Sequence, residues 1–132
     1  MNDNTLHGRV AQQESESRLL APRTKAFGLR VLRLFDSLPH KPAAQVIGRQ
    51  LLRSALSVGA NYRSACRARS KAEFAAKMGI VLEEADESKY WMEILVEGSL
   101  MKKRQLDALI QEATEITAMV VASIKTARRA KP

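Results

Sequence analysis

Four arginines stand along one segment of the chain at spacings that suit contact with a phosphate backbone. They are Arg49, Arg53, Arg63 and Arg67. At about 100° per residue, an ideal helix places all four within about 40° of the first, in a row about 27 Å long. Guanidinium groups bind phosphates through paired hydrogen bonds, so such a row can follow a nucleic acid without reading its bases. Arg69 and Lys71 extend this charge into the next segment.

The arginine row also has candidate partners within the protein itself. A charged helix face is commonly solvated or paired, and four carboxylates follow further along the chain: Glu83, Glu84, Asp86 and Glu87. Aromatic residues, on which bases stack, make up 5% of the chain, so nucleic-acid binding is expected to be backbone-driven and weakly sequence-specific. The alternative is a protein-interaction scaffold, in which the basic stripe pairs with acidic helix faces at subunit interfaces.

The charge is strongly segregated along the chain, whose formal net charge is +8 over 132 residues. Residues 23–77 carry twelve Lys or Arg and two acidic residues, whereas residues 78–101 carry six acidic residues and one Lys. A basic excess of this kind favours polyanionic partners, RNA or DNA among them, without naming one.

Residue patterns typical of catalytic or metal sites are missing from the sequence. It contains no Ser/His/Asp set, phosphate-binding glycine loop or Glu-x-x-His pair, and its two histidines, His7 and His40, are far apart. We therefore expect no enzymatic activity, metal, cofactor or small-molecule substrate. The lone Cys66 excludes an intrachain disulfide and is interpreted as an incidental thiol. The longest apolar run, 118–122, is far too short to span a membrane, and no signal peptide is evident, so a cytoplasmic protein is expected.

The elements that must position the arginines are predicted to be helices. Apolar residues recur with a helical period over about 24–38, 42–67, 70–97 and 102–128. The inner stripes include Phe27, Val31, Leu34, Phe35, Leu38, Ile47, Leu51, Val58, Met78, Val81, Met92, Leu106, Ile116 and Val120. Four amphipathic helices with short connections predict an all-α, antiparallel up-down-up-down four-helix bundle over 23–128. Residues 1–22 are interpreted as a mobile arm ending at Pro22, and residues 129–132 as a basic tail.

Several residues are expected to shape the ends and contacts of these helices. Ser70 and Glu73 match a capping box, and Gly98 is the expected C-cap. Trp91 and Ile94 widen the apolar face of the third helix beyond what a bundle buries, so they are predicted to meet another subunit.

The stretch 52–74, LRSALSVGANYRSACRARSKAEF, resembles the four-helix-bundle protein family encoded in intervening sequences of bacterial 23S ribosomal RNA genes. The matching positions are Arg53, Ser54, Ser57, Asn61, Ser70, Glu73, Phe74, Glu87 and Tyr90. Asn61 and Ser54 are interpreted as polar residues satisfied inside the bundle or at an interface, with a binding role as the alternative. The chain departs from the family at Ser64-Ala65, where Glu-Gly is common, and at Glu83-Glu84, where Gly-Ser is frequent.

The resemblance implies an antiparallel bundle assembled as a homopentamer, with no known enzymatic activity. Accessory proteins of diversity-generating retroelements are similar in fold, and those basic pentamers bind a reverse transcriptase and nucleic acid. By analogy, the resemblance implies a role associated with RNA or with a reverse transcriptase.

Overall fold

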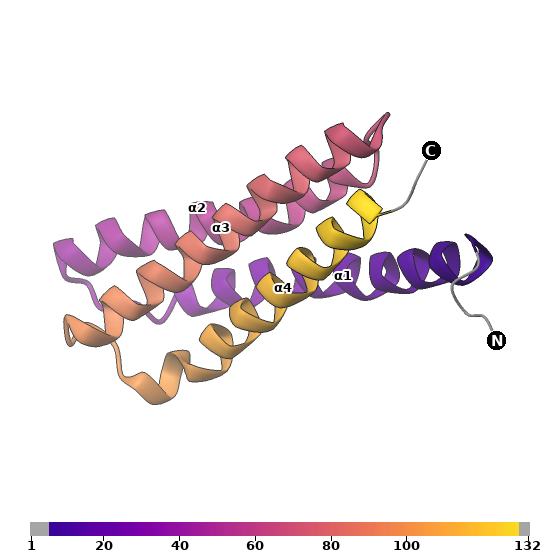
Figure 1. The fold of residues 1–132 in the computed structure, drawn as a ribbon. Coiled ribbons are helices and arrows are strands. Elements are labelled where there is room, and N and C mark those ends of the chain that lie inside the picture. Colours follow the sequence, from indigo (N-terminus) through magenta and orange to yellow (C-terminus); the bar gives the residue numbers. More distant parts are fainter. Residues whose placement is uncertain (1–5, 130–132) are drawn as a thin grey trace.

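Four α-helices joined by short loops make up the computed structural model of the chain (Figure 1). It describes the backbone of residues 6–129 and the side chains of residues 19–129. The helices are α1 (Leu6–Phe35), α2 (Pro42–Ala65), α3 (Lys71–Glu97) and α4 (Lys103–Arg129). No β-strand occurs between residues 6 and 129, so the all-α prediction is confirmed.

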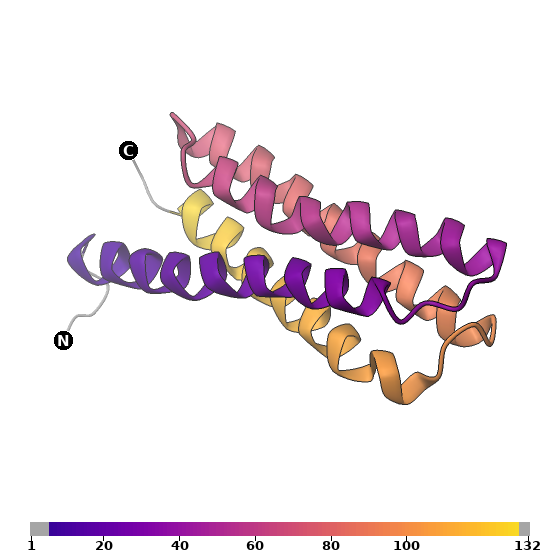
Figure 2. The same ribbon diagram turned by 180° about the vertical axis from the view of Figure 1, so that it is seen from behind.

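Each helix packs against its neighbours in the order of the chain, and α4 closes the set against α1. Within the described range, the diagonal pairs α1 with α3 and α2 with α4 make no close backbone contact. The loops 36–41 and 98–102 lie at one end of the molecule, and the loop 66–70 lies at the other (Figures 1 and 2). Helix α2, which carries Arg49, Arg53 and Arg63, is therefore flanked by α1 on one side and α3 on the other.

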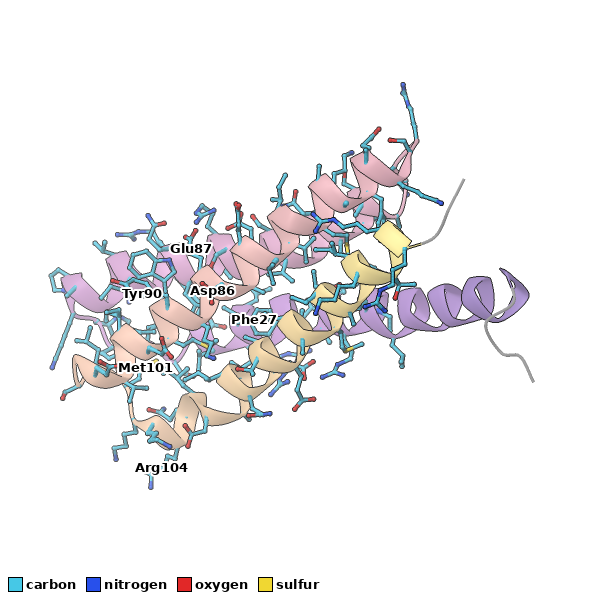
Figure 3. All side chains as sticks on the ribbon, viewed as in Figure 1. Phe27, Asp86, Glu87, Tyr90, Met101 and Arg104 are labelled. Atoms are coloured by element: carbon cyan, nitrogen blue, oxygen red, sulfur yellow. The ribbon has the colours of Figure 1, made fainter. Side chains whose placement is uncertain are left out.

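The core is built from the predicted inner stripes. Phe27 of α1, Val58 of α2, Met78 of α3 and Ile116 of α4 are fully buried, and Phe27 lies between the helices in Figure 3. Some stripe residues at the edges are half-buried and pack against the core: Leu34, Phe35, Ile47, Phe74 and Ile110. Burying apolar side chains from all four helices is the main stabilising contribution, at roughly 25 cal/mol per Å² of apolar surface.

The structure differs from the sequence-based expectation at the start of α1. The helix begins at Leu6 and runs through Pro22, whereas we expected the first helix to start at about residue 24, after a mobile arm that ends at that proline. Proline inside a helix removes one hydrogen bond and costs about 3 kcal/mol. Leu20 and Thr24, on either side of Pro22, are almost completely buried, and their packing offsets this cost. The predicted mobility of residues 1–22 stays a prediction, and residues 1–5 and 130–132 lie outside the described residues.

Both predicted caps of α3 are present, with Ser70 at the N-cap and Gly98 at the C-cap, and the C-terminal end has an unusual conformation. The Ser70 hydroxyl accepts a hydrogen bond from the Glu73 amide at 3.0 Å, as predicted, while the Glu73 carboxylate accepts from the Arg69 amide at 3.4 Å. At the other end Gly98 keeps a negative φ, and Ser99 adopts the left-handed conformation at φ 60°. The Leu100 and Ser99 amides donate to the carbonyls of Leu95 and Val96. This is a Schellman motif in which serine occupies the position that glycine usually takes.

Close approach of α1 and α2 depends on glycine. A Cβ atom added at Gly59 would lie 3.2 Å from the Thr24 carbonyl oxygen of α1. That distance is shorter than normal van der Waals contact, so a side chain here would push the two backbones apart. A residue without a side chain at this position therefore allows the two helices to pack closely.

Candidate nucleic-acid interface

The six basic residues predicted to contact phosphates all have exposed side chains. Arg49, Arg53 and Arg63 lie on α2, which ends at Ala65, two residues earlier than expected. Arg67 and Arg69 therefore lie in the 66–70 loop, and Lys71 begins α3. The Arg67 amide donates to the Ser64 carbonyl at 3.1 Å, so Arg67 stays in a turn directly after the helix.

Arg53 is engaged within the chain by two carboxylates of α3. Its guanidinium forms ion pairs with Glu84, at 3.4 Å, and with Glu87. The Glu87 carboxylate also accepts a hydrogen bond from the Trp91 indole nitrogen at 3.0 Å. The Trp91 and Arg53 hydrogen bonds hold the pKa of Glu87 below its ordinary value, and the bond to Glu87 raises the pKa of Arg53.

The other arginines of the predicted row differ from Arg53. Among the described side chains, 19–129, no carboxylate lies within 4.0 Å of the guanidinium groups of Arg49, Arg63 or Arg67. With respect to the side chains of residues 19–129, these three guanidinium groups are therefore open to an external anion. The structure thus divides the predicted row into one internally paired arginine and three that can donate hydrogen bonds to phosphate oxygens.

Three of the family-motif positions, Arg53, Ser54 and Glu87, take part in contacts between α2 and α3. The buried Ser54 and Ser88 hydroxyls are hydrogen-bonded at 2.8 Å, and Ser88 also donates to the Glu84 carbonyl at 2.9 Å. Asn61 donates to the carbonyl of Ser57 in its own helix at 2.8 Å. Ser54 and Asn61 are both satisfied within the chain, as interpreted from the sequence, although with different partners.

The predicted oligomer residues are less exposed than Tyr90, which precedes them on α3. Trp91 and Ile94 are half-buried, and Trp91 packs against the core. Tyr90 is 53% exposed and stacks edge-on against Trp91, with ring centroids 5.1 Å apart. Figure 3 shows Asp86, Glu87 and Tyr90 along the same stretch of α3. Exposed aromatic surface on α3 is therefore concentrated at Tyr90, which the sequence analysis did not assign to an interface.

Sequence reasoning missed an apolar groove between α1 and α2. It measures about 590 Å³ and includes Leu29, Leu56 and Gly59 among its lining residues, with Lys25 and Arg63 as its cationic members. The leucines could have been noticed because they lie outside the inner stripes of their helices. Leu56 in particular falls on the arginine-bearing face of α2.

No metal cluster and no membrane-spanning helix emerge from the described part of the chain. Residues 6–129 contain no group of three His, Cys, Asp or Glu side chains that could hold a metal ion. Within the same residues, no helix is long and apolar enough to cross a bilayer.

Comparisons with known proteins place this arrangement among related bundles. A family model described as 23S rRNA-intervening sequence protein matches residues 21–122. A crystal structure from Bacteroides thetaiotaomicron, described as a protein with unknown function from the S23 ribosomal protein family, is 32% identical to this chain. The match covers 83% of this chain and 98% of the other, with a TM-score of 0.78. No curated protein matches the chain.

Proposed function

The chain belongs to the 23S rRNA-intervening sequence protein family, and from this premise we propose that it is a non-enzymatic, oligomeric protein that binds nucleic acid. RNA is the first candidate, and the contacts are to backbone phosphates. The observation that carries the proposal is the set of exposed guanidinium groups of Arg49, Arg63 and Arg67, which have no carboxylate partner among the described side chains.

The chemistry of this surface suits a backbone more than bases. Arginine binds phosphate oxygens bidentately, whereas base stacking needs aromatic side chains beside the cations. Tyr62, the aromatic residue nearest the row in sequence, is buried. The proposed binding is therefore weakly sequence-specific, and Arg69 and Lys71 extend it toward the start of α3.

The proposed assembly is an antiparallel up-down-up-down bundle that associates into a homopentamer in the cytoplasm. The alternating positions of the loops in Figure 2 support the topology. The ring, and a reverse transcriptase as a further partner, are proposed by analogy with retroelement accessory proteins, which the sequence resemblance suggested. The proposal includes no cofactor and no small-molecule substrate.

A protein-interaction scaffold is the second candidate, and the Arg53 ion pairs favour it. They show that an α2 arginine and the α3 carboxylates are compatible partners within one chain. Glu83 and Asp86 of α3 are exposed and form no ion pair among the described side chains, so they are open to a similar contact between chains.

Binding to a single-stranded RNA of random sequence, measured across a salt series, tests the first candidate. Removing one phosphate-binding cation should change the slope of log K against log salt by about 0.7. Arg67→Ala should therefore flatten the slope by about 0.7 for each subunit whose Arg67 contacts the RNA. Arg53→Ala is the matched control on the same row, and it should leave the slope nearly unchanged because carboxylates already neutralise this guanidinium.

Two results would contradict the proposal. The first is an RNA affinity of the unmodified protein that does not change between low and moderate salt. The second is an equal change of slope for the two variants, because it would mean that the internal ion pairs do not compete with phosphate.

A further inference from the structure

Two surfaces of the chain complement each other in charge and in apolar content. The first is the groove between α1 and α2, which we call the acceptor groove and define by Lys25, Leu29, Leu56 and Arg63. The exposed fraction of Leu56 is 45% and that of Leu29 is 41%. The groove therefore exposes apolar surface to solvent, with two cationic side chains beside it. Contiguous apolar surface of this kind is typical of interaction sites.

The second surface is the outer face of α3, which we call the acidic ridge and define by Ile80, Glu83, Asp86 and Tyr90. Ile80 is 43% exposed and Tyr90 is 53% exposed. Glu83 and Asp86 lie between them in sequence, are exposed, and have no ion-pair partner among the described side chains. The acidic ridge therefore combines exposed apolar side chains with negative charge, whereas the acceptor groove combines exposed apolar side chains with positive charge.

The spacings of the two surfaces also match. Leu56 and Arg63 are seven residues apart on α2, and Glu83 and Tyr90 are seven residues apart on α3. Seven residues of helix correspond to about 10.5 Å. When the Tyr90 ring lies on the exposed leucines, the Glu83 carboxylate can therefore reach Arg63.

We propose that the acidic ridge of one copy docks in the acceptor groove of a second copy. The inference rests on the proposed oligomer, and it assigns the surfaces that form it. Because the groove and the ridge are different parts of the chain, the contact is heterologous, and repetition of the same contact builds a ring when the rotation closes. Arg63 then lies at the subunit contact, while Arg49 and Arg67 remain for phosphate.

Two single substitutions, each of which disrupts one of the two surfaces, test the proposal. Leu56→Glu places a carboxylate in the groove facing the ridge, and Glu83→Lys places a cation on the ridge facing the groove. Each should weaken self-association roughly 100-fold, because an unpaired buried charge at an interface is strongly unfavourable. Val46→Glu is the matched control for the first, since Val46 is a 55% exposed residue of α2 that does not line the groove. Asp107→Lys on α4 is the control for the second.

The oligomeric state of each protein is measured as its mass in solution by analytical ultracentrifugation, in the absence of nucleic acid. At a concentration just above that needed to assemble the unmodified protein, both controls should assemble and the two variants should each be monomeric. An equimolar mixture of the two variants should give 1:1 dimers, because the intact ridge of one fits the intact groove of the other and no further surface remains. Circular dichroism verifies that each variant is folded, and Leu29→Glu replaces Leu56→Glu should that chain fail to fold.

Three outcomes would overturn the inference: an unmodified protein that is monomeric at the highest concentration measured, controls that dissociate as much as the variants, or a mixture that stays monomeric. The RNA experiment changes Arg67 and Arg53, which belong to neither surface, so failure of the assembly and failure of nucleic-acid binding are distinguishable.

Discussion

Arg23 ties α1 to α4 through a cluster of charged hydrogen bonds whose energy can be measured. Its guanidinium donates to both oxygens of Glu112, at 3.0 Å and 2.5 Å, and to Glu115 at 3.0 Å. The hydrogen bond to Glu112 is the largest influence that raises the pKa of Arg23. We predict that a double-mutant cycle of Arg23→Met and Glu112→Gln gives a favourable coupling energy of about 1–2 kcal/mol.

The expected magnitude follows from the geometry. Two unit charges about 4 Å apart near a protein surface attract by about 4 kcal/mol, from which desolvation and the loss of up to about 2 kcal/mol of arginine side-chain entropy are subtracted. Isolated exposed pairs retain about 0.2–1 kcal/mol. The bidentate geometry and the low exposure of the Glu112 side chain, at 17%, place this pair above that range.

Urea unfolding followed by circular dichroism at one protein concentration measures each corner of the cycle. The Lys103 and Asp107 pair of α4 is the control, because it is a single exposed contact at 3.1 Å with i,i+4 spacing. Its coupling should be about 0.3–0.5 kcal/mol. A coupling at Arg23 no larger than at Lys103 would refute the reasoning, since the two-oxygen geometry would then contribute nothing.

Three further predictions concern local contacts. Ser99→Gly should raise the free energy of unfolding, measured by urea titration, by up to about 1 kcal/mol. Serine adopts a left-handed conformation at this position, which glycine adopts without strain. An unchanged urea midpoint of unfolding would contradict this prediction. Ser54→Ala should cost about 1 kcal/mol, with a similar coupling to Ser88→Ala, because their hydroxyls are hydrogen-bonded inside the core; additive single effects would refute the pairing. The pKa of Glu87 is lowered in the folded state, mainly by the hydrogen bond from Trp91. The contribution of Glu87 to stability is therefore complete above its ordinary pKa of about 4.5. That contribution is lost as the pH falls through the folded-state pKa. Acid titration of stability should therefore be less steep in Glu87→Gln, and identical profiles would contradict the assignment.

The helical period accounts for most of what the sequence predicted correctly about the fold. Residues such as Val58, Met78 and Ile116 recur at spacings that one helix face requires, and the structure buries them. The ends of the helices were predicted less well than their interiors. Pro22 is a strong local signal for a boundary, but burial of Leu20 and Thr24 against other helices outweighs it, and packing of that kind is not visible in a local pattern.

The candidate site illustrates the same limit. A helical wheel places Arg53 on the same face as the other arginines. It describes a single helix and carries no information about neighbouring helices. The position of α3 beside α2 decides that Arg53 meets Glu84 and Glu87. The acceptor groove escaped prediction for a related reason: Leu29 and Leu56 come from different helices, and they become one surface when α1 and α2 pack together.

The contacts between α2 and α3 also bear on the order in which the chain folds. The buried serine pair, the Arg53 ion pairs and the hydrogen bond from Lys77 to Ser64 at 2.8 Å all join these two helices. They are adjacent in the chain and connected by the five residues 66–70, so the entropy lost on closing the loop is small. We therefore predict that α2 and α3 form a hairpin early in folding, onto which α1 and α4 then pack. Its central amides should then be the slowest in the protein to exchange with deuterium.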